Sequence, residues 1–436
     1  MPVTAASIAA ALVARGLDPD ELVGKQSLYA AVLEHHAMRH SGPPTFVGWV
    51  PGRLEVFGKH TDYAGGRTLV CTVPRGFAVV ASARADGVVH VVDARRGEEL
   101  TIEPFERSAP RTGWRHYVEV AVQRLARNFP AAELGADITL ASDLPRASGM
   151  SSSSALIIAV AVALDRMGSL HSQPAWKRNI RSGLDAAAYY ACIENGRSFA
   201  ALEGDAGVGT HGGSEDHAAI VESRAGYVTA FAFVPPRAIG AALVPDWWRF
   251  VIAPSGVAAR KTGDAREPYN RLSAGAALLL EAWNRESPKA GSLAAALRSS
   301  PIAAERLRGL AESAATVETP AAWLRDRLDH FIREDARAEE ALNAFANADS
   351  VRLRGLSADS QRDAELLLRN QVPATIELAA EARKQGAFAA CSFGAGFGGA
   401  VWALIRTVEA EGFAKKWHPE AFVMTPGVPV TDLSGP

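Results

Sequence analysis

The feature that most constrains this chain is a run of four serines between a strand-like segment and a helix-like segment. Residues 136–144 alternate apolar and polar side chains, as a half-buried strand does. Residues 155–164 are uniformly apolar and contain no Gly or Pro, which predicts a buried helix ending near Gly168. The turn at residues 145–154 therefore lies at a helix N-terminus. There, unpaired backbone N–H groups and serine hydroxyls offer a site for an anion such as phosphate.

A plainer interpretation of the same turn is that the serines only cap the helix. Ser is a favoured N-cap residue, so a serine-rich turn does not by itself indicate a ligand. The turn is also not a Walker A loop, because no Gly-Lys-Ser or Gly-Lys-Thr follows it. Other segments have to decide between the two interpretations.

Length, charge and cysteine content favour a soluble, multidomain, cytoplasmic protein. A chain of 436 residues is long enough for two or three domains. A formal net charge of −2 gives no indication of nucleic acid or an anionic membrane as a partner. The three cysteines lie far apart, which argues against a disulfide framework or zinc ribbon and suits a reducing compartment. Neither a signal peptide nor a membrane span is indicated, and the oligomeric state is left open.

The remaining pattern predicts alternating strands and helices, followed by a helix-rich region. In the first half we expect helices over 4–40, 114–127 and 179–202, two short strands over 45–58 broken at Pro51, a β-meander over 68–92, and a strand over 226–234. A junction is expected near Pro235–Pro236. Beyond it we expect a strand over 250–253, helices over 269–283 and 285–385, and a strand–turn–strand over 387–405.

Three separated motifs then resemble one known family. Residues 51–66 resemble the galactokinase signature P-G-R-V-N-L-I-G-E-H-T-D-Y-N-G-G. The serine turn resembles the second motif of the GHMP small-molecule kinases, L-P-x-G-x-G-L-S-S-S-A, and residues 394–399 resemble their third motif, G-G-G-F-G-G. Residues 255–271 also resemble the galactokinase stretch that ends in Tyr-x-x-Arg-Arg. All the motifs occur in the family's order.

The resemblance implies an α+β, two-domain GHMP kinase fold with the active site in the cleft between the domains. The expected domains are residues 1–234 and 235–436, the second with a helical insert at about 285–375. The resemblance also implies a sugar kinase that transfers the γ-phosphoryl group of ATP to the anomeric hydroxyl of galactose or a close analogue, with ATP and Mg²⁺ required.

Two residues match the family's catalytic positions. Asp216 matches the Asp of the motif G-I-M-D-Q, and Arg53 matches the Arg of the first motif. A carboxylate beside a permanent cation can accept or orient the proton of an attacking hydroxyl. The alternative is a plain salt bridge with no role in catalysis.

The serine motif implies the nucleotide site. Its ATP-binding residues would be Ser148, Gly149, Ser151, Ser152 and Ser153, with Ser153 nearest the Mg²⁺. Glu194 matches the family's magnesium carboxylate, but this chain has about ten extra residues between Glu194 and the catalytic Asp. Asp185, Glu203 and Asp205 therefore remain alternatives to Glu194.

The sugar-binding positions of the family match Lys59, His60, Asp62, Gly213 and Tyr269. Tyr269 could alternatively serve only in packing. Lys59 departs from the family, which has a Glu that binds the C6 hydroxyl. A Lys donates but does not accept, so it would suit a C6 carboxylate, as in a uronic acid such as galacturonate. Alternatively, Lys59 and Glu55 simply pair, because they lie on the same side of one strand.

Three functions therefore stay open at this point. The first is a sugar 1-kinase acting on galactose or a C6 variant. The second is a non-catalytic sensor that binds sugar and ATP and regulates a partner protein. The third is a kinase of a non-sugar alcohol such as mevalonate or homoserine, against which the His-Thr-Asp-Tyr loop argues.

Overall fold

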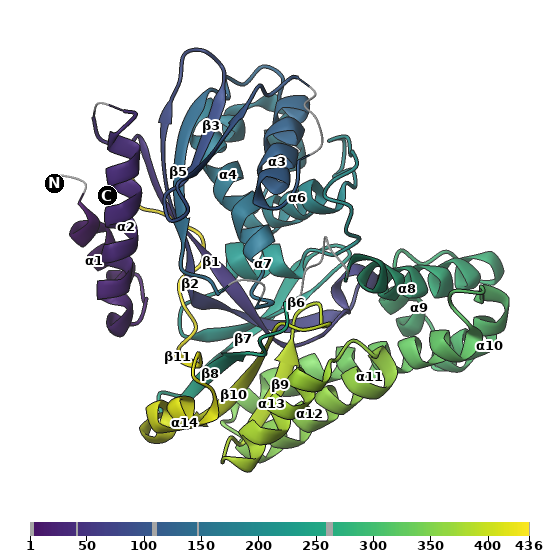
Figure 1. The fold of residues 1–436 in the computed structure, drawn as a ribbon. Coiled ribbons are helices and arrows are strands. Elements are labelled where there is room, and N and C mark those ends of the chain that lie inside the picture. The colour runs from purple at the N-terminus through teal and green to yellow at the C-terminus, as the bar shows by residue number, and fades with distance from the viewer. Residues whose placement is uncertain (1–3, 41, 107–110, 146–147, 259–264, 436) are drawn as a thin grey trace.

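The computed structural model describes residues 4–40, 42–106, 111–145, 148–258 and 265–435. These residues form one eight-stranded sheet and one four-stranded sheet, with helices on the faces of both (Figure 1). Residues 146 and 147 of the serine turn, and residues 259–264 of the Tyr-x-x-Arg-Arg-like stretch, lie outside the described part. No helix in the described part combines the length and apolarity needed to cross a bilayer.

The first sheet has the strand order β12-β1-β2-β5-β3-β4, and β6 and β7 extend it from the far end of β2. Its strands are β1 (Phe46–Phe57), β2 (Arg67–Ala83), β3 (Val89–Asp93), β4 (Glu98–Ile102), β5 (Ala136–Ser142), β6 (Tyr227–Ala232), β7 (Arg237–Leu243) and β12 (Thr431–Asp432). The expected β-meander is wrong, because β3 pairs with β5 in parallel and with β4, not with β2. The expected break at Pro51 is instead a register shift within one continuous strand, β1.

Helices cover both faces of this sheet because successive residues of β1 point to opposite sides. Phe46 and Val50 pack with α3 (Trp114–Asn128) and α4 (Ser152–Gly168). Val47 and Trp49 pack instead with α1 (Ala5–Ala14) and α2 (Leu22–Ala37). Figure 1 shows α1 and α2 on one side of the sheet and α3, α4, α6 (Gly183–Asn195) and α7 (Glu215–Glu222) on the other.

The long helix expected over 179–202 is shorter in the structure. A separate helix, α5 (Pro174–Asn179), precedes it, and α6 ends at Asn195. Gly196 has φ 80°, a left-handed conformation that closes the helix. The chain then turns back at once, so that the Gly-rich loop after it reaches the start of α7.

The second sheet has the order β11-β8-β10-β9 and packs against the first. Its strands are β8 (Trp248–Pro254), β9 (Ala389–Phe393), β10 (Ala400–Arg406) and β11 (Phe422–Met424). One hydrophobic cluster contains Phe57 and Leu69 of the first sheet together with Phe250 and Trp402 of the second. The strand–turn–strand expected over 387–405 is thus present, with the Gly-rich turn between β9 and β10.

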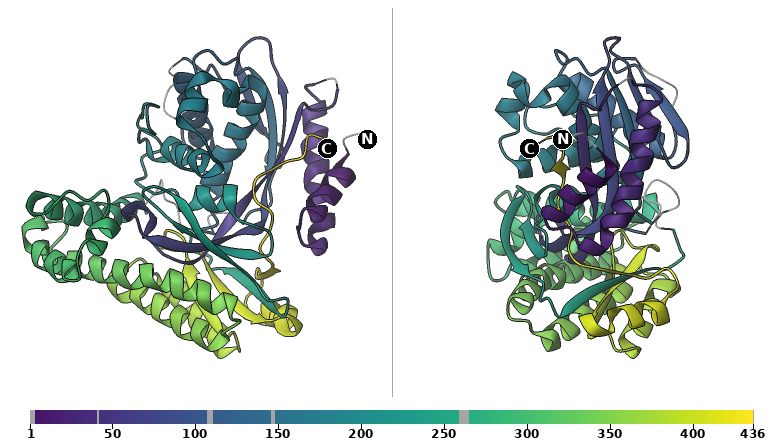
Figure 2. Two further views of the ribbon diagram at one scale, coloured as in Figure 1. Left: turned by 180° about the vertical axis from the view of Figure 1, so that it is seen from behind. Right: turned by 90° about the vertical axis from the view of Figure 1, so that its left-hand side faces the viewer.

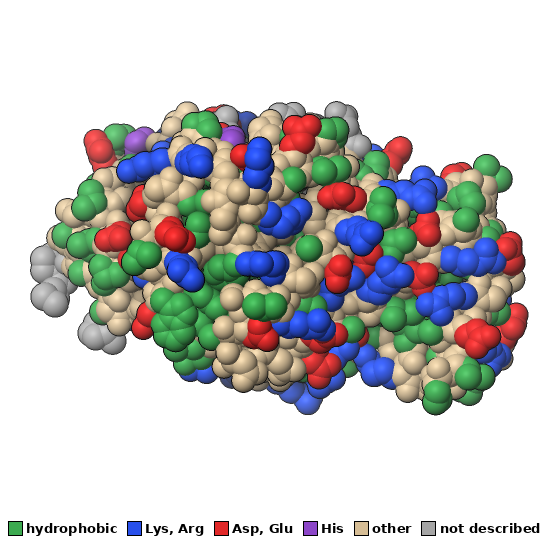
Figure 3. All heavy atoms as spheres, turned by 90° about the horizontal axis from the view of Figure 1, so that it is seen from below, with side chains coloured by type: hydrophobic (Ala, Val, Ile, Leu, Met, Phe, Trp, Pro, Cys, Tyr) green, Lys and Arg blue, Asp and Glu red, His purple; other side chains and the backbone are tan. Residues whose placement is uncertain are grey.

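The helical region after β8 extends away from both sheets and then returns along them (Figure 2). Its helices are α8 (Arg266–Glu286), α9 (Leu293–Arg298), α10 (Ala303–Ala314), α11 (Ala321–Ala346), α12 (Ser350–Asp363) and α13 (Pro373–Lys384), and α14 (Ala410–Trp417) follows β10. In the returning part, α11 lies against β2, β6 and β7, and the next two helices lie against the second sheet. On the face seen from below, basic and acidic side chains are intermingled (Figure 3). This face is therefore ordinary solvated surface.

The course of the chain bears on where the two domains divide. β7 lies beyond the expected junction at Pro235–Pro236, yet it pairs with β6 in the first sheet. β12, near the C-terminus, returns to pair with β1. We therefore propose a boundary between β7 and β8, with the C-terminal segment added to the first domain.

Candidate active site

Arg53 lies where β1, the serine turn and α7 meet. Its Nη2 and Nε lie 2.6 and 2.7 Å from Oδ1 of Asp216, the second residue of α7. Its Nη1 donates to the backbone carbonyl of Gly149 in the serine turn, at 2.8 Å. Burial alone would lower the pKa of Arg53, but the carboxylates of Asp216, Glu215 and Glu55 outweigh that effect and raise it. The two residues that match the family's catalytic positions are thus paired, and the buried cation also links Asp216 to the serine turn.

The end of the serine turn contacts the same carboxylate. Ser154 Oγ donates to Glu194 Oε2 at 2.7 Å and lies 3.3 Å from Asp216 Oδ2. Ser153 Oγ donates to Glu194 Oε1 at 3.1 Å. Sequence reasoning missed Ser154, although it belongs to the same serine run, because the family motif has Ala at that place. The N-terminus of α4 therefore lies directly beside Asp216.

The other residues predicted to bind ATP lie in the same turn. Ser151 has φ 57° and is the N-cap of α4, and Ser152, its first helical residue, is half-buried. Ser148 is buried, and its hydroxyl donates to the Pro145 carbonyl at 2.9 Å. This hydrogen bond lies within the serine turn and stabilises it. A Cβ on Gly149 would lie 3.3 Å from the Phe393 carbonyl, so the serine turn adjoins the Gly-rich turn after β9.

The predicted sugar-binding residues also gather here, apart from Lys59. The ring centroids of His60 and Tyr269 lie 5.3 Å apart. Asp62 Oδ2 accepts the backbone N–H of Glu215 at 3.1 Å. Gly213 faces Asp62 so closely that a Cβ there would lie 2.2 Å from Asp62 Oδ2. Residues from β1, α7, α8 and the loop after β1 therefore surround one space.

That space is a pocket that is partly open to solvent. Its lining is largely polar and holds both members of the Arg53–Asp216 pair. It is lined by Arg53, Glu55, His60, Asp62, Tyr63, Ala191, Glu194, Asn195, Thr210, Gly212, Gly213, Glu215, Asp216, His217, Tyr269, Gly394 and Ala395.

Two lining carboxyl groups, Glu55 and Glu215, were not predicted as site residues. Glu55 Oε1 accepts the Gly394 N–H at 3.3 Å, and Glu215 Oε1 lies 3.2 Å from Arg53 Nε. Burial, and then the charge of Glu55, raise the pKa of Glu215 well above its usual value. Burial is also the largest cause that raises the pKa of Glu55. The family motifs have uncharged Asn and Met at these places, so the acidic lining is a property of this chain.

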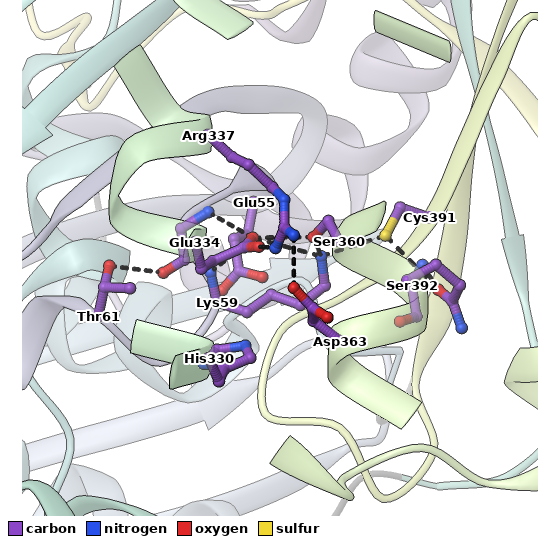
Figure 4. Close-up of polar contacts among 12 residues, drawn as sticks. Glu55, Lys59, Thr61, His330, Glu334, Arg337, Ser360, Asp363, Cys391 and Ser392 are labelled. Carbon is purple, nitrogen blue, oxygen red and sulfur yellow. Dashed lines mark hydrogen bonds and ion pairs between the residues drawn. The ribbon is translucent and has the colours of Figure 1, made fainter. Parts of the chain in front are cut away.

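Lys59 does not line the pocket, and the expectation that it faces the sugar is not met. Its side chain is 1% exposed and points toward α11 and α12 (Figure 4). Its Nζ lies 3.0 Å from Ser360 Oγ, 3.2 Å from Cys391 Sγ and 4.0 Å from Glu334 Oε1. Burial alone would lower the pKa of Lys59, but Cys391, Glu334 and Glu55 outweigh it and raise the pKa. The nearest ion pair of Lys59 is with Glu334, not with Glu55.

The side-chain oxygens of Glu194 and Ser153, at the N-terminus of α4, are suitable ligands for a magnesium ion. Mg²⁺ prefers one or two carboxylates, hydroxyl or water oxygens, and substrate phosphates. Glu194 and Ser153 offer a carboxylate and a hydroxyl that already share one location. Of the alternatives, Asp185 accepts the Arg181 N–H at 2.9 Å and Asp205 pairs with Arg124 at 3.1 Å, and neither lines the pocket. Glu203 does not line it either.

Comparison with protein families finds two matching models. A "GHMP kinases N terminal domain" matches residues 116–193, which hold the serine turn, and a "Galactokinase galactose-binding signature" matches residues 34–83, which hold β1 and the loop after it. Curated galactokinases of Chloroflexus aggregans and Chloroflexus aurantiacus are 27% and 28% identical over 85% and 89% of this chain and 86% and 90% of theirs. A galactokinase of Actinobacillus pleuropneumoniae is 35% identical over 28% of this chain and 32% of its own.

Solved structures show the same fold. A Lactococcus lactis galactokinase complexed with galactose aligns with a TM-score of 0.72 and 21% identity, covering 93% of this chain and 100% of the other. A Methanococcus jannaschii mevalonate kinase aligns with a TM-score of 0.56 and 14% identity, covering 89% and 99%. The GHMP kinase fold expected from the motifs is thereby confirmed.

The contact between Gly213 and Asp62 makes Gly213→Ala a sharp test of the pocket. Its Cβ would displace the Asp62 carboxylate, so we expect at least about a tenfold loss of sugar affinity, or 1.4 kcal/mol. The matched control is Gly355→Ala in α12, where a Cβ meets nothing within 4 Å. Calorimetric titration with galactose would measure both, and equal affinities for the two variants would contradict the assignment of Asp62.

The buried surroundings of Lys59 predict the effect of Lys59→Glu. This change places a carboxylate beside the buried Glu334, so we expect unfolding free energy to fall by about 3–5 kcal/mol. Lys59→Met, which keeps most of the apolar stem, should cost less. Thermal unfolding of the two variants measures the difference. A fully stable Lys59→Glu protein with altered sugar preference would show that position 59 faces the substrate after all.

Proposed function

Taking the chain as a galactokinase-like sugar kinase of the GHMP fold, we propose that it transfers the γ-phosphoryl group of ATP to the anomeric hydroxyl of galactose or a close analogue. The observation that carries this proposal is the Arg53–Asp216 pair, which lies between the serine turn and the residues matching the sugar site. A phosphate bound at the serine turn and a sugar hydroxyl bound near Asp62 would therefore both lie close to the Asp216 carboxylate.

In this proposal Asp216 accepts or orients the proton of the attacking hydroxyl. Arg53, 2.6 Å away, stabilises the negative charge of Asp216 and of the transferring group. Phosphoryl transfer demands mainly positioning and charge stabilisation, and a fixed guanidinium supplies both. A plain structural salt bridge would not need to lie in the wall of a pocket.

The nucleotide would bind with its phosphates at the N-terminus of α4. The backbone N–H groups there, with the hydroxyls of Ser151, Ser152 and Ser153, suit an anion. Glu194 and Ser153 would hold Mg²⁺, which neutralises phosphate charge when bound. Ser154 fixes Glu194 relative to Asp216, because its hydroxyl contacts both carboxylates.

The pocket favours a neutral acceptor over a uronic acid. Lys59, the residue that suggested a C6 carboxylate, is turned toward Glu334. The lining instead contains Glu55, Asp62 and Glu215, and its guanidinium is engaged by Asp216. An ionised carboxylate on the substrate would be desolvated beside these carboxyl groups while the Arg53 guanidinium is already paired, which disfavours its binding.

An ADP-release assay with Mg-ATP and a panel of sugars tests the function. We expect turnover with galactose and at least a tenfold lower kcat/KM with galacturonate. Glucose and mevalonate serve as acceptor controls. Sugar and ATP binding without ADP release would favour the sensor instead, and comparable turnover of galacturonate would contradict the neutral acceptor.

The role of Asp216 predicts a selective loss in Asp216→Asn. Loss of a general base typically lowers turnover by about 10²–10⁴-fold. Nucleotide affinity should stay within a few-fold, because the serine turn is unchanged. Single-turnover kinetics together with titration of a non-hydrolysable ATP analogue would measure the two separately. Near-wild-type turnover would place the base elsewhere.

A further inference from the structure

One face of α11 contacts the loop that carries His60 and Asp62, two of the predicted sugar-binding residues. We call residues 58–67, which run from the end of β1 to the first residue of β2, the sugar loop. Two acidic residues of this helix, Glu334 and Asp335, follow Arg327 by seven and eight residues. This spacing is about two helical turns, so all three side chains lie on the same face of α11. Arg327 binds the middle of the sugar loop, Glu334 its beginning and Asp335 its end.

Glu334 holds the beginning of the loop. Its Oε1 accepts the backbone N–H groups of Gly58 at 3.0 Å and Lys59 at 3.4 Å, and the Ser360 hydroxyl at 2.9 Å. Its Oε2 accepts from Arg337 Nη1 at 3.0 Å, and the side chain is fully buried (Figure 4). Although burial would raise the pKa of Glu334, Lys59, His330 and Arg337 lower it to about 2. Glu334 is therefore an ionised acceptor at neutral pH.

Arg327 holds the middle of the loop. Its Nη2 donates to the His60 carbonyl at 2.5 Å and to the Tyr63 hydroxyl at 2.9 Å. Its Nε donates to the Leu272 carbonyl in α8 at 3.2 Å. Because α8 also carries Tyr269, the same guanidinium fixes the sugar loop relative to the helix that supplies the opposite wall of the pocket.

Asp335 holds the end of the loop. Its Oδ1 accepts the backbone N–H of Arg67 at 2.7 Å, and its Oδ2 lies 2.6 Å from Arg67 Nη2. With Glu334 and Arg327, this contact defines the path of the loop from end to end.

The backbone between these contacts is strained. His60 has φ 57°, in the left-handed region that costs a non-glycine residue about 1 kcal/mol or more. Hydrogen bonds to the two preceding amides and to the His60 carbonyl itself hold this conformation. It aims the His60 ring at the Tyr63 hydroxyl and the Ala395 carbonyl, 3.0 and 3.1 Å away, inside the pocket.

We propose that Arg327 and Glu334 are positioning residues for the acceptor sugar, because they hold the sugar loop in the strained backbone that presents His60 and Asp62 to the pocket. Neither side chain lines the pocket. The proposal rests on the proposed function for the identity of the ligand. It assigns the helical insert a role in sugar binding and none in nucleotide binding, since the serine turn is fixed by Arg53.

Kinetics of Glu334→Gln and Arg327→Lys test the proposal. We expect the KM for galactose to rise at least about tenfold, kcat to fall less, and the KM for ATP to stay within about twofold. The matched control is Glu340→Gln on the same helix, whose carboxylate pairs with Arg352 away from the loop. A lower melting temperature with unchanged KM values for both substrates would mean that α11 only stabilises the fold, and would overturn the proposal.

Hydrogen exchange provides a test that does not depend on turnover. In Arg327→Lys, which keeps the positive charge, amides of residues 59–66 should exchange at least about tenfold faster than in the wild type, while those of residues 149–156 stay unchanged. Equal exchange in the sugar loop would overturn the proposal. A wild-type protein that releases no ADP with any sugar would refute the proposed function alone, because the exchange experiment would still decide this inference.

Discussion

The arrangement of the candidate site depends on a single buried guanidinium. A charge with 2% exposure is stable only where carboxylates and carbonyls surround it, so Arg53 requires Asp216 and the Gly149 carbonyl nearby. This requirement joins β1, the serine turn and α7. The serine turn and the residues that match the family's sugar site lie far apart in the sequence, and this requirement brings both of them close to Asp216.

The serine turn and the sugar loop are held by different parts of the fold. The serine turn is fixed by Arg53 and adjoins the Gly-rich turn before β10. The sugar loop is fixed by side chains of α11 that do not themselves line the pocket. Under the proposed function, nucleotide and acceptor recognition would therefore be separable in this chain. The acidic residues Glu55 and Glu215 then distinguish its acceptor side from the family pattern.

The sequence alone was sufficient for features that local pattern determines. The strand, serine turn and helix around Ser152 followed from periodicity, and the pairing of Arg53 with Asp216 followed from the family motifs. The direction of Lys59 could not be predicted, because its partner Glu334 lies 275 residues away on a helix whose packing no local pattern reveals. Likewise, α6 ends because Gly196 adopts a left-handed backbone conformation, and the spacing of apolar residues does not predict that conformation.

The most direct test of this account is a crystal structure with galactose and a non-hydrolysable ATP analogue. We predict the terminal phosphate at the N-terminus of α4 and the anomeric hydroxyl within about 3 Å of the Asp216 carboxylate, on the same side as Arg53. A sugar bound with its anomeric hydroxyl directed away from Asp216, or a nucleotide bound outside the serine turn, would contradict it.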